Sequence, residues 1–176
     1  MVKTVSIISA IVLVNIFLLC SCAGTIQTVR QTQQPISDFK KALIISSENS
    51  QYIKFKFGII TPGAYIILPD DPPQKHEKIG NTDMVIKREL EKYGIQAEIG
   101  KVGDIPEDID LIILYYDTWR WDLKKILDRL DIVLISPNNQ QQIAKSTYYI
   151  NRNKEFHNFP TPEKEVPKMI KELLNR

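Results

Sequence analysis

The sequence predicts an α+β fold: a mostly antiparallel mixed sheet with two main helices packed on one face, after a signal peptide and flexible tether. Short β-prone segments recur between residues 42 and 150, whereas helical periodicity is clear only near residue 85 and at the C-terminus. Hydrophobic residues make up 43% and charged residues 25% of the 176-residue chain, which is ordinary for a globular protein. We therefore expect a signal peptide at 1–21, a tether at 22–38 and a single domain at 39–176.

The N-terminus has the organisation of a bacterial export signal. Lys3 supplies a positive charge before the apolar run Val5–Leu19, which is short for a membrane span. The run leads into Leu19–Cys22 (LCSC), which has the lipobox pattern of an aliphatic residue followed by a small residue directly before a cysteine. We expect lipidation of Cys22, with acyl chains such as palmitate as the membrane anchor. Two alternatives stay open: ordinary cleavage after Ala23, and an uncleaved anchor.

The residues around the signal junction also predict a location. Ala23 follows the cysteine, where many enterobacterial lipoproteins retained in the inner membrane carry aspartate. In a host with two membranes we expect the outer membrane, with the domain facing the periplasm. Both cysteines of the chain, Cys20 and Cys22, lie at this junction, so the domain has no internal disulfide. The segment from Ala23 to about Asp38 is polar and has no sustained period, which is typical of a flexible tether.

The charge of the chain limits which classes of partner are expected. The formal net charge is +2 and no basic stripe is present, which excludes the usual footprint for nucleic acid. The expected partners are the membrane, through the N-terminal lipid, and another envelope protein.

Strands are predicted where apolar runs are continuous or alternate with polar residues. They cover residues 42–46, 51–60, 64–68, 96–99 and 110–121, followed by a hairpin of 131–136 and 142–150. The segment 123–130 is ambiguous, because its aliphatic residues have helical spacing although it could instead continue the strand pair.

Two helices are predicted. The first covers Thr82–Tyr93, with Asn81 or Thr82 as its cap and Gly94 as its end. The second follows Thr161, with Pro162 at its first position, although the later Pro167 leaves open a start near that residue.

The strand predicted at 110–121 carries the most distinctive residues. Alternation places one set of side chains on one face: Tyr115, Asp117, Trp119, Trp121 and Leu123. The other face receives Tyr116, Thr118, Arg120 and Asp122. We expect Asp117 to accept a hydrogen bond from an indole N–H, and Arg120 to pair with Asp122. Two interpretations stay open: a buried core face, or an exposed aromatic platform for a partner or glycan.

The stretch Tyr115–Leu123 also resembles the motif Y-x-D-x-W-x-W-D-L of small bacterial lipoproteins. In those proteins a strand and a hairpin follow, for which the counterparts here are Leu130–Ser136 and Ile143–Ser146. The resemblance covers residues 80–175 and implies a β-rich 110–150. It also implies a fold similar to the amino-terminal domain of TolB and to curli-secretion CsgG-type domains. It brings no known activity and so assigns no catalytic residue.

The chain lacks the common catalytic and metal-binding motifs. Its two histidines, His76 and His157, are not spaced as metal ligands. Its seven glycines form no nucleophile elbow, P-loop or dinucleotide-binding motif. We therefore expect a non-enzymatic accessory or interaction domain of an envelope lipoprotein, with no metal and no cofactor.

Two functional alternatives remain. One is a lipoprotein that binds a small molecule or a glycan through an aromatic surface around Trp119 and Trp121. The other is a hydrolase that uses Asp70, Asp71 or Glu77, and it requires these carboxylates to converge in a pocket.

Overall fold

A computed structural model describes most of the chain after the predicted signal peptide. The described residues are 24–31, 38–45, 50–53, 59–61, 64–66, 73–76, 79–101, 103, 105–122, 124–150 and 159–174. Several predictions fall outside these residues: the signal peptide at 1–21, Cys22, Ala23, Leu123 and His157, and the acidic residues Asp70, Asp71 and Glu77. Within the described ranges, no helix is both long enough and apolar enough to cross a membrane.

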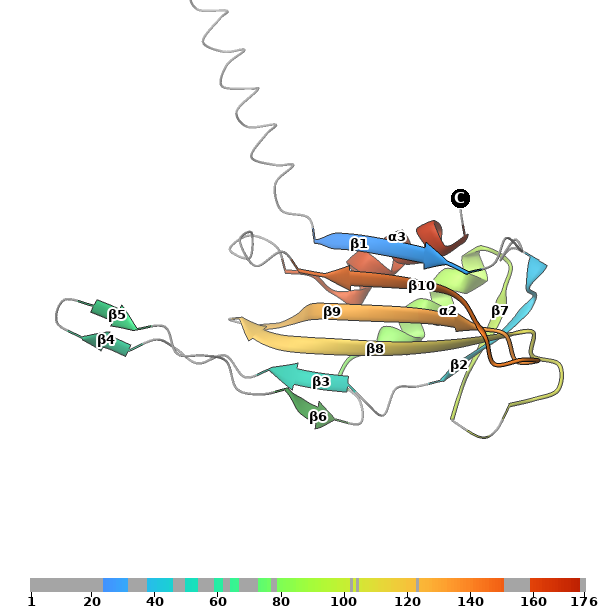
Figure 1. Cartoon of the computed structure of the whole chain (residues 1–176), viewed down its shortest axis with the longest axis horizontal. Coiled ribbons are helices and arrows are strands. Elements are labelled where there is room, and N and C mark those ends of the chain that lie inside the picture. Colours follow the sequence, from blue (N-terminus) through green and yellow to red (C-terminus); the bar gives the residue numbers. More distant parts are fainter. Residues whose placement is uncertain are drawn as a thin grey trace, which may run out of the picture.

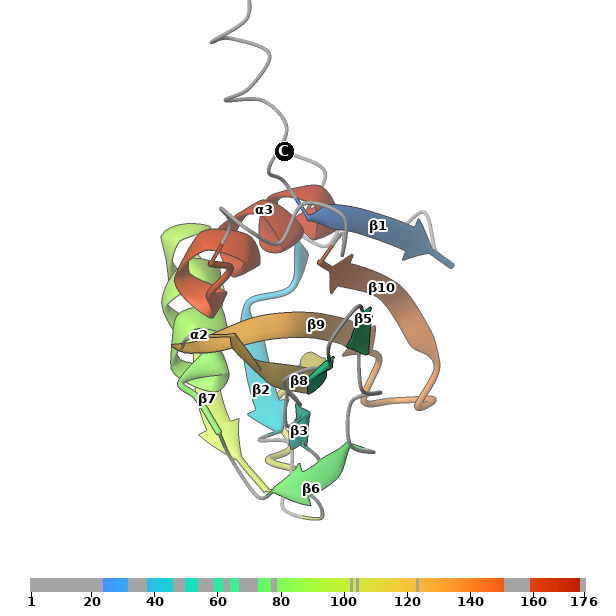
Figure 2. The ribbon, with the colours of Figure 1, turned by 90° about the vertical axis from the view of Figure 1, so that its left-hand side faces the viewer.

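An eight-stranded mixed sheet with two helices on one face forms the fold (Figures 1 and 2). Its main path is β1 (Thr25–Arg30), β10 (Gln142–Tyr149), β9 (Lys124–Ile135), β8 (Leu111–Asp122), β2 (Lys41–Ile45) and β7 (Gln96–Gly100). Neighbours from β1 to β8 pair antiparallel, whereas β8, β2 and β7 pair in parallel. The predicted α+β class and mostly antiparallel mixed sheet are confirmed.

The remaining strands lie toward the far end of β8. β3 (Ser50–Ile53) pairs in parallel with the last part of β8 and antiparallel with β6 (Gln74–His76). β4 (Ile59–Thr61) and β5 (Ala64–Ile66) form a separate two-stranded sheet beyond that end of the main sheet (Figures 1 and 2). The single strand predicted at 51–60 is therefore described only at its two ends, as β3 and part of β4.

The two helices α2 (Thr82–Lys92) and α3 (Pro162–Leu174) cover the same face of the sheet. Each buries an apolar stripe against the inward side chains of the strands, and these residues form one core. The helical residues of this core are Val85, Ile86, Leu90, Val166, Met169, Ile170, Leu173 and Leu174. A smaller cluster, which includes Leu43 and Ile112, lies on the opposite face of the sheet.

The ends of the helices match the sequence-based predictions only in part. α2 ends before Gly94, whose φ of 81° suits glycine, as predicted. The predicted side-chain cap is wrong, because the Asn81 amide donates to Glu163 at 2.8 Å instead. This hydrogen bond holds the pKa of the Glu163 carboxyl below its ordinary value. α3 begins at Pro162, so Pro167 lies inside the helix and does not start it.

The prediction of a flexible tether at 22–38 is wrong for 25–30, which form the edge strand β1. Ile26 packs against the core and Thr28 donates to the Ser146 hydroxyl at 3.1 Å. The guanidinium of Arg30 donates to the backbone carbonyl of Leu173 in the last turn of α3. Cations near helix C-termini are stabilising, so β1 is fastened to both the sheet and the helix layer.

The ambiguous segment 123–130 is strand where it is described, because β9 begins at Lys124. A β-bulge explains its helix-like spacing: Thr118 pairs with Arg129, but the next residue, Trp119, pairs with Leu127. The extra residue, Asp128, interrupts the alternation of side chains. Leu127 and Leu130 therefore both reach the core although they are three positions apart.

Candidate functional site

The aromatic face of β8 is buried up to Trp119 and exposed beyond it. Tyr115, Asp117 and Trp119 are buried, and Trp119 is only 6% exposed. Trp121 is 44% exposed, so neither the buried core face nor the exposed platform holds for both indoles. The helix layer ends at this point: Gly80, just before α2, lies so close that a Cβ there would be 2.4 Å from Cζ2 of Trp119.

Asp117 lies in the core, which agrees with the first of the two open interpretations, but its predicted partner is wrong. Its carboxylate accepts hydrogen bonds from the buried hydroxyls of Ser50 and Thr82, the latter at 2.8 Å. The indole N–H of Trp119 has no hydrogen-bond partner among the described residues. Asp117 therefore joins β3, β8 and the first residue of α2, which is a structural arrangement and not a ligand site.

Arg120 has a partner that alternation did not predict, whereas its predicted pairing with Asp122 stays a prediction, because that side chain lies outside the described residues. Its guanidinium lies 2.8 Å from the carboxylate of Asp128, and both side chains are largely buried. The bulge in β9 positions Asp128 for this contact, whereas alternation alone pointed to Asp122. The backbone of Asp122 ends β8, and its side chain is outside the described set.

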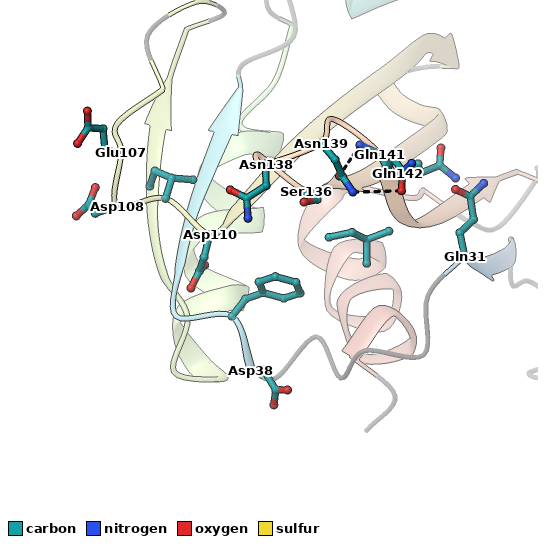
Figure 3. Close-up of a pocket in the computed structure, with 13 residues that line it drawn as sticks. Gln31, Asp38, Glu107, Asp108, Asp110, Ser136, Asn138, Asn139, Gln141 and Gln142 are labelled. Carbon is teal, nitrogen blue, oxygen red and sulfur yellow. Dashed lines mark hydrogen bonds between the residues drawn. The ribbon is translucent and has the colours of Figure 1, made fainter.

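A polar pocket of about 930 Å³ lies at the other end of the sheet (Figure 3). It is lined by the residue after β1, the segments that precede β2 and β8, and the turn between β9 and β10. Its acidic residues are Asp38, Glu107, Asp108 and Asp110, and its amides include Asn138 and Asn139. Glu107 and Asp108 point outward at one rim, whereas Asp38 lies below Asp110, so the carboxylates do not converge (Figure 3).

Structural contacts already occupy two of these carboxylates. Asp110 accepts hydrogen bonds from the backbone N–H groups of Lys40 and Lys41, at 2.8 and 3.0 Å. Asp108 pairs with the ammonium of Lys41, which lowers the pKa of the carboxyl and raises the pKa of the ammonium. Sequence reasoning missed this pocket, because the loops that form it are far apart in the chain and carry no motif.

No metal site emerges from the described part of the chain, where no three His, Cys, Asp or Glu side chains are grouped to hold an ion. Of His76 only the backbone is described, at the end of β6.

Comparison with known proteins gives likenesses of fold. No family model and no curated protein matches the chain. PelC from Paraburkholderia phytofirmans, solved as a dodecamer, is 13% identical over 86% of this chain and 96% of its own, with a TM-score of 0.49. A DUF4136 family protein from Bacteroides thetaiotaomicron is 10% identical over 86% and 97%, with a TM-score of 0.49.

A PDZ domain protein from Parabacteroides distasonis is 13% identical over 90% of this chain and 38% of its own, with a TM-score of 0.39. At these identities and scores, the likenesses assign neither a site nor an activity to the chain.

Proposed function

We propose that this chain is a bacterial envelope lipoprotein, acylated at Cys22, whose domain is a non-enzymatic accessory that contacts another envelope protein. The proposal includes its place at the outer membrane, facing the periplasm, and its kinship with small lipoproteins that carry the Tyr115–Leu123 motif. The observation that carries it is the position of β1, which begins at Thr25, only three residues after the lipobox cysteine.

Gly24 also packs on the domain, so the segment between Cys22 and the folded residues is even shorter. A Cβ at Gly24 would lie 2.2 Å from the ring of Tyr148, so the backbone at Gly24 lies directly against a buried side chain. Only Ala23 then separates Cys22 from residues that are packed on the domain. An acyl anchor at Cys22 would hold the domain directly at the bilayer surface.

The face of the sheet without helices supports a binding role. It exposes Val29, Tyr116 and Tyr149, with exposed fractions of 60%, 42% and 38%. Among them the Asp131 carboxylate lies 3.0 Å from the guanidinium of Arg129 and 3.3 Å from the ammonium of Lys145. Exposed aromatic residues such as these tyrosines are enriched at protein–protein interfaces, and so is arginine.

The small-molecule or glycan alternative keeps one observation in its favour, the exposed indole of Trp121. The burial of Trp119 weighs against it, because a stacking surface made of both rings is absent. Trp121 is also not among the residues that line the polar pocket. We therefore prefer the interaction domain.

The anchor is tested by expressing the full chain with its own signal. Mass spectrometry should find an acylated peptide that begins at Cys22, and Cys22→Ala should abolish both processing and membrane association. Cys20→Ala is the matched control and should be processed normally. A free amino terminus at Gly24 would refute the anchor.

The interaction is tested by site-specific photocrosslinking in intact envelopes. A photoreactive residue at Tyr116 or Tyr149 should give a discrete crosslinked product. The same residue at Met84, which is 53% exposed on α2 on the opposite side of the sheet, serves as the control. Equal crosslinking from both sides would refute the sheet face as the interface.

A further inference from the structure

We propose that the tip where β8 ends and β9 begins, which carries Trp121, Lys124 and Lys125, rests in the headgroup region of the bilayer that holds the anchor. This inference depends on the proposed acylation of Cys22. It adds a second point of membrane contact and therefore an orientation of the domain.

The register of the sheet shows that the tip extends past the start of β1. Thr25 pairs with Tyr149, Tyr149 with Arg129, and Arg129 with Thr118, so these residues lie level across four strands. β8 continues from Thr118 to Asp122, and its end lies beyond the start of β1 (Figure 1). At the usual rise per residue of a strand, these four residues add about 13 Å.

The anchor has a similar reach. Cys22 precedes Thr25 by three residues, which span at most about 11 Å when fully extended. The tip therefore extends along the strand direction as far as the acylated cysteine can. If the strands lie perpendicular to the bilayer plane, the tip reaches the level of the headgroups.

The side chains of the tip suit that level. Trp121 is 44% exposed and lies opposite Lys125, and Lys124 and Lys125 are both exposed. The ammonium of Lys124 lies 3.9 Å above the ring centre of Phe159, which braces the tip against the segment that leads into α3. Tryptophan is enriched at membrane–water interfaces, and lysine beside it can reach anionic headgroups. The tip also contains one acidic residue, Asp122, against its two lysines.

A second ribbon lies beyond the same end of the sheet. The hairpin of β4 and β5 extends past β3 and pairs with no strand of the main sheet that the structure describes (Figures 1 and 2). Its strands have the sequences IIT and AYI, which are mostly apolar. A lone two-stranded hairpin is at best marginally stable in water. Such a ribbon at the anchored end is consistent with a lipid surface there.

The charge distribution favours the same orientation. The acidic residues of the polar pocket, Asp38, Glu107 and Asp108, lie around the opposite end, beyond the last residue of β1. With the lysines of the tip toward an anionic surface, these carboxylates lie far from it. The competing orientation lays the β1 edge on the bilayer and would bring Val29 to the lipid.

The test uses tryptophan fluorescence of the acylated full chain reconstituted into phosphatidylcholine–phosphatidylglycerol vesicles, with and without brominated acyl chains. The chain has two tryptophans, and Trp119 is buried in the core. If Trp121 sits among the lipids, the Trp121→Phe variant should lose about half or more of the bromolipid quenching. Lys124→Glu combined with Lys125→Glu should also reduce the quenching, whereas Lys101→Glu, an exposed lysine in the loop after β7, should not.

Each outcome decides between the two orientations. Equal quenching in wild type and Trp121→Phe would overturn the contact, and so would bromolipid quenching of a Val29→Trp probe placed in the Trp121→Phe background. The mass of the N-terminal peptide from the same preparation separates this result from failure of the anchor. An acylated chain without quenching at Trp121 overturns the tip contact alone, whereas an unacylated Cys22 overturns the proposed function as well.

Discussion

The hydroxyl of Thr82 donates a hydrogen bond of 2.8 Å to the carboxylate of Asp117, so the first residue of α2 is joined to the central strand β8 inside the core. The hydroxyl of Ser50 donates to the other oxygen of the same carboxylate, from β3. A carboxylate beside the N-terminus of a helix also interacts favourably with the helix dipole. One acidic side chain thus connects three elements that are distant in sequence.

Replacing Asp117 by alanine should destabilise the domain by about 2–4 kcal/mol, because two buried hydroxyl donors would lose their acceptor. Asp117→Asn keeps one carbonyl oxygen and should cost less. Urea unfolding at neutral pH measures both. A loss below about 1 kcal/mol for the alanine variant would contradict this assignment of the carboxylate.

Truncation of the two tryptophans should cost very different amounts of unfolding free energy. Trp119→Ala leaves a large cavity beneath Gly80 and should cost about 3–5 kcal/mol. Trp121→Ala removes an exposed ring and should cost less than about 1 kcal/mol. Similar losses at both positions, measured by urea unfolding, would contradict the division between a buried and an exposed indole.

Tyr148 should make the domain sensitive to alkali. Its burial, together with the negative charges of Glu165 and Asp128, raises the pKa of its hydroxyl above the ordinary value of 10.0. The unfolded chain ionises this group near that pH while the folded chain retains the proton, so stability is intact below pH 10 and declines above it. Unfolding free energies at about pH 8 and about pH 11 should show this decline in wild type and a smaller one in Tyr148→Phe.

At neutral pH the Tyr148→Phe variant should be as stable as wild type or slightly more stable. The Tyr148 hydroxyl is buried and has no hydrogen-bond partner among the described residues, so its removal takes away an unsatisfied group. A clear destabilisation of this variant at pH 7 would show that the hydroxyl has a partner.

A chain that begins at Asp38 should fold less stably than one that begins at Gly24, by about 1–3 kcal/mol. It lacks β1, whose Ile26 packs on the core and whose Arg30 bonds to the end of α3. It also exposes the edge of β10, so we expect more aggregation. Arg30→Ala in the longer chain isolates the contact with α3. Equal urea midpoints for the two lengths would mean that β1 adds nothing to stability.

Periodicity was sufficient to predict the fold class, both helices and the hairpin of β9 and β10. These elements bury one continuous face, and a buried face leaves a regular apolar pattern in the sequence. β1 left no such pattern, because an edge strand with one open face needs few apolar residues, and Thr25, Gln27, Thr28 and Arg30 are polar. Its partner β10 is also more than 100 residues away in the chain.

The candidate sites were less predictable, for two physical reasons. The bulge at Asp128 adds one residue to β9 and changes which side chains meet, so strict alternation missed the contact of Arg120 with Asp128. Alternation also assigns a residue to a face without saying how far the helix layer extends over that face. That extent separates Trp119 from Trp121. The polar pocket depends on where three loops converge, which no local pattern records.

The contact between Gly24 and Tyr148 has a consequence for motion. A flexible linker over the predicted tether, residues 22–38, would have a root-mean-square end-to-end distance of about 20–25 Å, and the domain could move that far from its attachment point. With Gly24 packed on the domain, an acylated Cys22 permits almost no such excursion, and the sheet can only tilt and spin about the anchor. A partner in the same membrane would then meet the domain after a two-dimensional search. It would also find a domain whose motion is restricted to tilting and spinning, so that less translational entropy is lost on association.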